Sequence, residues 1–371
     1  MARLWGREWT RTELEQRVGD LLQIGGVRLV ELADGKERGV RAAQFRTGSG
    51  LAFTVLLDRG LDISHADWCG KSLGWRSMTG DVHPAYFEPT GEPGGLGWVR
   101  SFFGGLVTTC GLNWAGAPCR DEEAGPARLG ARNLGLHGYI SHTPAMNISA
   151  DGAWEGDEYR MWVRGRCHEG LVFGENLILH REISTTLGSN ALTIRDRVEN
   201  AGFDRTEHML LYHVNIGFPV VDEGAELLSP SLAVTARDAA AEDGAERAQL
   251  LDGPAPGYHE KAYFHRLGTA ADGTTGTAIV NRALGFGVYV KFNRNQLPFF
   301  TQWKMLGQRN YVVGMEPANC LPLGRVAERE AGRLQHLEGR EVREYSLEIG
   351  ALTSADAIAD FEAELRGWTH P

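Results

Sequence analysis

Residues 191–199 read ALTIRDRVE, and this stretch decides the fold class of the chain. Leu192, Ile194 and Val198 fall on one face of a ribbon that repeats every two residues, and polar side chains dominate the other face. Strands with one apolar and one polar face are typical of antiparallel sheets, because helix-covered parallel strands read as continuous apolar runs. The stretch therefore predicts an antiparallel strand with one buried face.

The same alternation recurs at residues 159–166, 286–292 and 344–350. The 48 glycines and 14 prolines are scattered rather than pooled in a linker, which indicates many short elements joined by turns. Two sheets packed face to face are the natural way to bury many one-faced strands. We therefore predict an all-β protein, a large antiparallel β-sandwich with a few short peripheral helices, as a single domain over residues 1–371.

Helical periodicity is confined to the two ends of the chain. In residues 353–368, Ile358, Phe361 and Leu365 are spaced three and four apart behind a threonine or serine that can cap a helix. Residues 11–22 are a weaker helical candidate. We expect a C-terminal amphipathic helix that lies on the sandwich and a short N-terminal helical segment.

Composition excludes several kinds of partner. The chain has 38 lysines and arginines against 48 aspartates and glutamates, a net charge of −10, and no basic cluster, so nucleic acid is not expected. No run approaches 18 apolar residues, and charges occupy the place of a signal peptide's apolar region, so no membrane partner is expected. Five cysteines without CxxC spacing agree with a reducing compartment, and we expect a cytoplasmic protein. The oligomeric state stays open.

Standard catalytic motifs are absent. The sequence has no GxxxxGK[ST], HExxH or GxSxG, and the glycines in 91–97 do not sit between a strand and a helix, so nucleotide binding is not expected. His259, Glu260 and His265 match no spacing in which two metal ligands share a helix face, so we expect them at the surface.

The segment LGLHGYISHTP, residues 134–144, places His137 beside a glycine. A neighbour without a side chain lets a ligand approach closely, although a core histidine bonded to a carbonyl fits the segment equally well. His142 would face the other way on a regular strand, so it is a candidate for a supporting position.

The segment EHMLLYHVNIGFP, residues 207–219, sets His213 and Asn215 side by side on one face of a strand. A buried imidazole without a partner costs roughly 1–3 kcal/mol, so His213 is either satisfied by the core or lines a cavity. The adjacent Asn215 favours the cavity.

Two further segments carry charged residues at predicted strand ends. YVVGMEPANCLP, residues 311–322, delivers Glu316 just before a proline, where partial burial would raise the pKa of the carboxyl and make it a better base; a solvated loop glutamate is the alternative. VLLDRGLDIS, residues 55–64, holds Asp58 and Arg59. These two residues form a surface ion pair, or Arg59 is a bidentate donor to the oxygens of a ligand.

Together the four segments resemble the aldose 1-epimerase (galactose mutarotase-like) superfamily, and more closely its uncharacterised bacterial branch. LHG around His137, LLYHVNIG with His213, YVVGMEP with Glu316 and DRG with Arg59 are similar to that family's motifs and keep their order. The resemblance covers roughly residues 27–352.

The resemblance implies a twisted β-sandwich and acid–base opening of a sugar hemiacetal. Glu316 would take the proton of the anomeric hydroxyl and His213 would give one to the ring oxygen, the two being about a sugar ring apart and in opposite protonation states. His137 and Arg59 would hold hydroxyls and the ring oxygen, and Trp303 would offer a stacking face. The reaction needs no cofactor and no partner beyond a small-molecule sugar.

The sequence also departs from the family's pattern. The galactose enzymes follow their acid histidine with an aromatic pair, whereas Val214, Asn215 and Ile216 follow His213 here. Lys304 adds polarity beside Trp303. With His142 and Asn215, Lys304 completes the set of expected substrate-binding residues.

Two alternatives remain. A divalent metal could be held by histidines and support a different sugar isomerisation through an enediol; the histidines available are His65, His137, His142, His208 and His213. Alternatively, the sandwich binds carbohydrate without catalysis.

Overall fold

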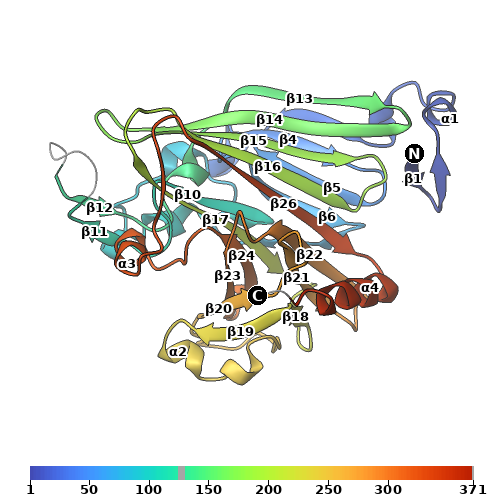
Figure 1. Ribbon diagram of the computed structural model, residues 1–371. Coiled ribbons are helices and arrows are strands. Elements are labelled where there is room, and N and C mark those ends of the chain that lie inside the picture. Colours follow the sequence, from blue (N-terminus) through green and yellow to red (C-terminus); the bar gives the residue numbers. More distant parts are fainter. Residues whose placement is uncertain (124–129, 370–371) are drawn as a thin grey trace.

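Two large antiparallel sheets face each other and form the body of the molecule (Figure 1). The computed structural model describes residues 1–123 and 130–369. Within these ranges the larger sheet has twelve strands and the smaller sheet has eight. The predicted antiparallel β-sandwich is confirmed.

In spatial order, the main path of the larger sheet is β19 (Ser231–Ala236), β20 (Lys261–Leu267), β23 (Phe299–Leu306), β24 (Tyr311–Ala318), β17 (Thr206–Gly217), β10 (Val107–Leu112), β6 (Asp62–Trp68), β5 (Leu51–Leu56), β4 (Arg41–Arg46) and β3 (Gly26–Glu31). Two short strands join this path, β25 (Gln335–Leu337) beside β17 and β7 (Lys71–Ser72) beside β6.

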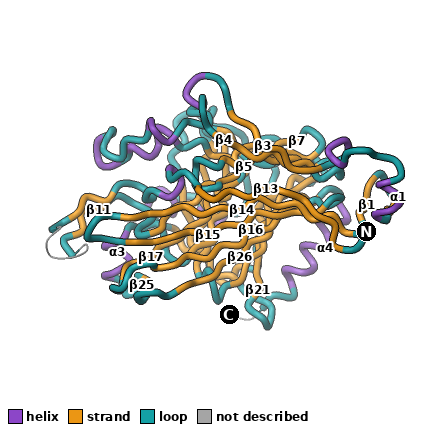
Figure 2. Tube along the Cα trace, turned by 90° about the horizontal axis from the view of Figure 1, so that it is seen from above, coloured by secondary structure: helices purple, strands orange, loops and turns teal. Residues whose placement is uncertain are grey.

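The smaller sheet follows the order β13 (Met146–Glu155), β14 (Glu158–Gly170), β15 (Asn176–Thr186), β16 (Ala191–Asn200), β26 (Val342–Leu352), β22 (Phe286–Asn293), β21 (Thr274–Asn281) and β18 (Glu226–Leu228). Figure 2 shows β13, β14, β15, β16 and β26 side by side from above. Three two-stranded pairs complete the strands: β1 (Ala2–Leu4) with β2 (Arg7–Trp9), β8 (Trp75–Arg76) with β9 (Gly104–Gly105), and β11 (Cys119–Asp121) with β12 (Arg132–Leu134).

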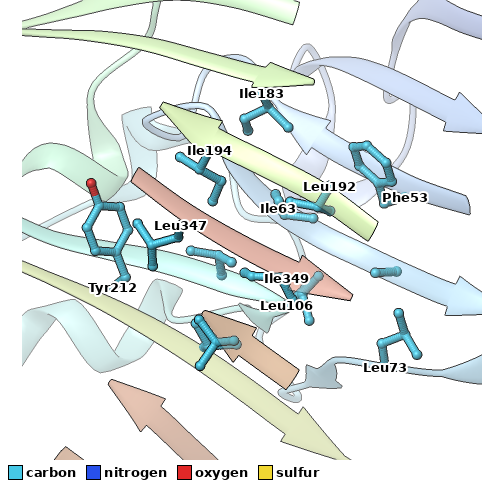
Figure 3. Close-up of a cluster of buried hydrophobic side chains, with 14 of the residues drawn as sticks. Phe53, Ile63, Leu73, Leu106, Ile183, Leu192, Ile194, Tyr212, Leu347 and Ile349 are labelled. Carbon is cyan, nitrogen blue, oxygen red and sulfur yellow. The ribbon is translucent and has the colours of Figure 1, made fainter. Parts of the chain in front are cut away.

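The core lies between the two sheets and is formed by every second side chain of their strands. Leu192, Ile194 and Val198 of β16 are buried there, as their alternation predicts, and Ile63 of the larger sheet lies in the same cluster (Figure 3). The pattern fails at Asp196, which shares the buried face.

A buried ion pair explains that exception. Arg181 of β15 donates through Nη2 to Asp196 at 2.7 Å and through Nη1 to Asp62 of β6 at 3.0 Å, and all three side chains are fully buried. Tyr212 of β17 donates its hydroxyl to Asp196 at 2.6 Å. A buried charge needs such partners, so one arginine links the two sheets.

The helices are few and short. α4 (Ala355–Arg366) lies within the predicted range 353–368, is capped by Ser354, and buries its apolar stripe against the smaller sheet. At the other end the structure corrects the expected helical range 11–22: α1 spans only Arg11–Glu15, and a separate 3-10 turn covers Leu21–Gln23. Asp20 caps the N-terminus of that 3-10 turn, so the turn begins anew and does not continue α1.

Two other helices, α2 (Ala239–Glu242) and α3 (Arg325–Glu330), are equally brief. Among the described residues, no helix is long and apolar enough to cross a membrane.

The larger sheet is covered on its outer face as well. Alternate side chains of β17, including Met209 and Leu211, point away from the sandwich and pack with Trp98, Phe102 and Trp114 in a second apolar cluster. These tryptophans and the phenylalanine come from the segments between β8 and β12. The outer face of β17 therefore has a layer of loops above it, and the candidate site lies between sheet and loops.

Candidate functional site

A pocket of about 680 Å³ lies on the outer face of the larger sheet. Its lining includes residues of β17, β23 and β24 together with the loops that cover them. Of the eight residues predicted to act on or bind a substrate, four line this pocket: Glu316, His213, His137 and Trp303.

The sheet register brings Glu316 and His213 together. β17 and β24 are neighbours, and their register pairs Leu211 with Ala318 and Val214 with Met315, which sets His213 opposite Glu316. Nε2 of His213 lies 3.2 Å from Oε1 of Glu316, and the two side chains are only 6% and 3% exposed. Neither Nδ1 of His213 nor Oε1 of Glu316 has a hydrogen-bond partner among the described residues.

A third polar residue extends this row. Thr301 of β23 pairs directly with Glu316, is buried, and its hydroxyl also has no hydrogen-bond partner in the described part of the chain. Unpartnered buried polar atoms are uncommon in folded proteins. Atoms of this kind on the floor of a pocket are available to a ligand.

Burial sets the electrostatics of the pair. It raises the pKa of Glu316 to about 8, with a further rise from nearby Glu260 and an opposing effect from Arg237. It also lowers the pKa of His213 to about 4, against a hydrogen-bond contribution from Asn215 that raises it. Near neutral pH both groups are therefore favoured in their uncharged forms, with the proton on Glu316. The predicted rise in the pKa of Glu316 is confirmed, and the solvated-loop alternative is wrong.

The chain around Glu316 differs from expectation in one respect. β24 continues to Ala318, beyond the proline that was expected to end the ladder, and Pro317 pairs with Phe300. Glu316 thus projects from within a strand, which holds its backbone more firmly than a strand end would.

His137 lies in a turn after β12, with φ at +60°. Its Nδ1 accepts a hydrogen bond from the backbone N–H of Gly116 at 3.3 Å, and its ring lies 5.9 Å from that of His213. Burial lowers its pKa to about 3, with a contribution from His213. Gly138 admits a backbone carbonyl rather than a ligand, because a Cβ there would meet the oxygen of Gly111 at 2.3 Å.

Trp303 stands beside the pair, its ring centre 5.2 Å from that of His213. Its Nε1 donates to Oε2 of Glu260 at 2.8 Å, and Oε1 of Glu260 accepts from Arg237 at 3.1 Å. Glu260 and His259 are exposed, as expected, but they also line the pocket, which sequence reasoning missed. The surface position expected for His265 is wrong, because this side chain is buried beside Ser231 and Gln302.

Arg59 is not in the pocket, which corrects its expected contact with a sugar. The side chain is fully buried and donates to the carbonyls of Ser141 at 2.6 Å, Val82 at 2.6 Å and Ser101 at 2.9 Å. Its five N–H groups suit this task of tying loops together. The expected surface pair with Asp58 is also absent, since Asp58 binds Arg41.

His142 is likewise behind the pocket wall. It is buried, stacks on Phe87 with ring centres 3.7 Å apart, and its Nε2 lies 2.7 Å from Oγ of Ser101. The expectation that His142 binds substrate is therefore corrected, because its ring is enclosed by protein.

Asn215 and Lys304 also lie outside the pocket lining. The amide of Asn215 donates to the carbonyls of His213 at 2.8 Å and Gly104 at 3.1 Å, so it supports the strand that carries His213. Lys304 lies on the face of β23 opposite to Trp303, and its ammonium group donates to carbonyls including that of Leu250. Both expected substrate contacts are corrected.

The alternation of side chains along a strand already shows that Trp303 and Lys304 lie on opposite faces. In FFTQWKML, residues 299–306, Thr301, Trp303 and Met305 share one face, whereas Lys304 falls on the other. Trp303 and Lys304 could not both reach one pocket from a regular strand.

The five histidines of the metal alternative do not converge. His65 is exposed beside Asp67, and His208 is buried against the carbonyl of Leu112 and the hydroxyl of Tyr345. Over residues 1–123 and 130–369, no group of three or more His, Cys, Asp and Glu side chains is placed to hold a metal ion.

A second hollow, also of about 680 Å³, lies on the outer face of the smaller sheet. Its walls include Arg164, Arg195 and Arg197, which are about half exposed and lie near Glu182 and Glu344. Exposed ion pairs of this kind are weak and are common on solvated sheet faces. The buried acid–base pair therefore identifies the first pocket as the candidate site.

Comparison with known proteins agrees with this fold. The family described as a domain of unknown function, DUF4432, matches residues 37–351. No curated protein matches the sequence.

Solved structures share the fold at low sequence identity. A protein from Klebsiella pneumoniae, provisionally named an aldose 1-epimerase, is 24% identical with a TM-score of 0.86 over 97% of this chain and 95% of that one. A galactose mutarotase-like protein from Clostridium acetobutylicum is 11% identical, with a TM-score of 0.58 over 89% of this chain and 99% of that one. Galactose 1-epimerase from Lactobacillus acidophilus is 13% identical, with a TM-score of 0.55 over 88% of this chain and 98% of that one. The predicted galactose mutarotase-like fold is confirmed.

Proposed function

This chain belongs to the DUF4432 family, and from that premise, its fold and its pocket we propose that it is a carbohydrate-active isomerase, namely a mutarotase that interconverts the anomers of a reducing sugar. One observation carries the proposal. Glu316 and His213 lie 3.2 Å apart at the floor of a pocket large enough for a sugar, and burial favours a single proton on the pair.

The close spacing fits the chemistry of ring opening. One group must take the proton of the anomeric hydroxyl while another gives a proton to the ring oxygen. Both of these oxygens are bonded to the same carbon, so the two catalytic atoms need to be near neighbours. The expected separation of a ring's width was therefore too large, and 3.2 Å between Nε2 and Oε1 suits a single anomeric centre better.

The protonation state favours one assignment of roles. The resemblance implies that Glu316 is the base, but burial favours the protonated carboxyl of Glu316 and a neutral imidazole on His213, which has one ring nitrogen able to take a proton. We therefore assign the acid to Glu316 and the base to His213. His213 takes the hydroxyl proton as the C1–O bond becomes a carbonyl, and the bond from C1 to the ring oxygen breaks.

The electron pair of that broken bond stays on the ring oxygen, which receives the proton of Glu316. The pair is then an imidazolium beside a carboxylate, and their attraction in a buried site offsets the cost of separating charge. After rotation of the free aldehyde, the same transfers in reverse close the ring as the other anomer. The scheme uses no cofactor.

The neighbouring side chains support a sugar ligand. Trp303 offers a ring face beside the pair, and aromatic faces pack against the C–H groups of sugars. The free hydroxyl of Thr301 and the ring of His137 are within the same lining and provide hydrogen-bonding groups.

The proposal is tested by the rate at which freshly dissolved α-anomers of aldoses equilibrate, followed by polarimetry or NMR. We expect acceleration by the native protein and a fall in kcat/KM of about 10²- to 10⁴-fold in Glu316→Gln and in His213→Ala, the range for loss of a general acid or base. Glu344→Gln, an exposed glutamate on the other sheet, is the matched control and keeps the native rate. Sugar binding without any acceleration would instead support a non-catalytic carbohydrate-binding protein.

A further inference from the structure

We propose that the substrate is a reducing sugar that carries an apolar group away from its anomeric carbon. This inference rests on the proposed function, because it describes the ligand of the same pocket. The anomeric hydroxyl must be free for ring opening, so the apolar group belongs elsewhere on the sugar.

The volume of the pocket exceeds that of one hexose. A hexose has twelve heavy atoms and takes up at most about 360 Å³ if each heavy atom needs no more than the roughly 30 Å³ of a water molecule in the liquid. The pocket has about 680 Å³. A single sugar ring seated on Glu316 and His213 would therefore leave a large part of the pocket to another portion of the ligand.

Part of the pocket lining is apolar and exposed. Met78, Leu96 and Val99 line the pocket and are 65%, 42% and 44% exposed. Exposed apolar side chains that gather at the rim of a hollow mark ligand-binding surfaces, because their contact with water is unfavourable until a ligand covers them.

An aromatic wall connects this apolar rim to the catalytic pair. The rings of Trp98 and Phe102 lie 4.4 Å apart, and Phe102 lies 5.3 Å from the ring of His213. Trp75 packs on Phe102 at 5.8 Å from the other direction. An apolar group attached to a bound sugar would be in contact with this wall from the floor of the pocket to its mouth.

Ser77 and Thr79 line the pocket on either side of Met78 in the sequence, but their hydroxyl hydrogens are not free to bond a ligand. The hydroxyl of Ser77 donates to the carbonyl of Phe102 at 2.6 Å, and the hydroxyl of Thr79 donates to the carbonyl of Gly80 at 3.2 Å. Their donors are thus used within the protein.

The lining of the pocket also has a polar part. Arg237, His259, Glu260 and Asn310 belong to it, with Arg237 and Glu260 paired at 3.1 Å. A sugar that carries an apolar group matches a lining with both polar and apolar parts, whereas a sugar that is polar all round would leave Met78, Leu96 and Val99 in contact with hydroxyls.

The test compares D-glucose and D-galactose with their 3-O-, 4-O- and 6-O-benzyl ethers, and with the reducing disaccharides gentiobiose and melibiose as polar extensions of similar size. Anomer exchange is measured by NMR and binding by calorimetry, on the full chain. We expect kcat/KM for at least one benzyl ether to exceed that of its parent sugar by tenfold or more, the range for an apolar group in a fitting pocket. Equal values, or a preference for the disaccharides, would overturn the inference and leave the mutarotase proposal standing.

Absence of acceleration with every sugar would overturn the mutarotase proposal alone. Calorimetry then decides the inference by itself: tighter binding of a benzyl ether than of its parent supports it, and equal or weaker binding overturns it.

A rim variant shows whether the apolar side is responsible. Val99→Asp places a charge on the exposed rim, and we expect the ratio of kcat/KM for the benzyl ether to that for the parent sugar to fall to near one. Val172→Asp is the matched control, since Val172 is 75% exposed and lies outside the pocket lining; it keeps the native ratio. An unchanged ratio in Val99→Asp would show that the apolar group does not contact this rim. Both residues are exposed, so the fold tolerates the charge.

Discussion

Burial favours the uncharged forms of both Glu316 and His213 near neutral pH. Burial disfavours the ionised carboxylate and the imidazolium alike, so it reverses the usual order of the two pKa values, raising that of Glu316 to about 8 and lowering that of His213 to about 4. A carboxylate beside an imidazole often forms an ion pair, but here burial favours the neutral pair. The two titrations belong to the pair rather than to either residue alone.

We predict a bell-shaped dependence of kcat/KM on pH for the free enzyme. Activity rises as pH passes about 4, where His213 loses its proton and becomes a base, and falls as pH passes about 8, where Glu316 loses the proton that it must donate. Glu260→Gln removes a negative charge that raises the pKa of Glu316, so it moves the alkaline limb to lower pH. Activity that increases through pH 8 would refute the assignment of roles.

Three neighbouring strands assemble the site by their register. β17, β24 and β23 place His213, Glu316 and Thr301 in one row across the outer face of the larger sheet. In the next row, Gly314 lies between Asn215 and Trp303. A side chain at position 314 would point at the catalytic pair, so the absence of one leaves the space in which carboxyl and imidazole meet.

Gly314→Ala tests this spacing. A Cβ at position 314 would lie 2.6 Å from Oε1 of Glu316 and 3.2 Å from Cε1 of His213, so at least one catalytic side chain must move. A displacement of this size costs about 10²-fold in activity, and we expect that loss in kcat/KM. Gly253→Ala, where a Cβ meets its nearest atom at 3.5 Å, is the control. A Gly314→Ala protein with native kcat/KM would show that the pair tolerates a wider spacing.

At the scale of the whole molecule, the two sheets are joined by apolar packing and by one buried charged cluster. Arg181 lies between Asp196 in its own sheet and Asp62 in the other, and none of the three side chains reaches solvent. The cluster also contacts Tyr212, on the same strand as His213 but on its opposite face. The strand that carries His213 is therefore held from the core side by this cluster.

We expect Arg181→Met to lower the free energy of unfolding by about 3–5 kcal/mol, because it leaves two buried carboxylates without their positively charged partner. Urea unfolding followed by circular dichroism measures this loss. Arg164→Met removes a half-exposed arginine from the solvent face of the same sheet and should change the free energy by less than about 0.5 kcal/mol. A loss below 1 kcal/mol in Arg181→Met would mean that the cluster does not hold the sheets together.

The sequence by itself determined the architecture and the two central residues. Alternation is a local property: every second side chain of a strand shares a face, so ALTIRDRVE and its counterparts indicate one-faced strands and hence a sandwich without knowledge of the partners. The residues alone left a solvated glutamate and a core histidine open, and the resemblance of short motifs singled out Glu316 and His213.

Only the tertiary structure decided which other polar residues meet them. Arg59 and His142 come from segments that resemble binding loops, yet they tie those loops together behind the wall. Glu260 reads as a surface residue, yet its loop folds over Trp303. A strand's pattern states which side chains share a face, but whether water, a loop or a pocket lies against that face depends on contacts between residues distant in sequence, which no local pattern encodes.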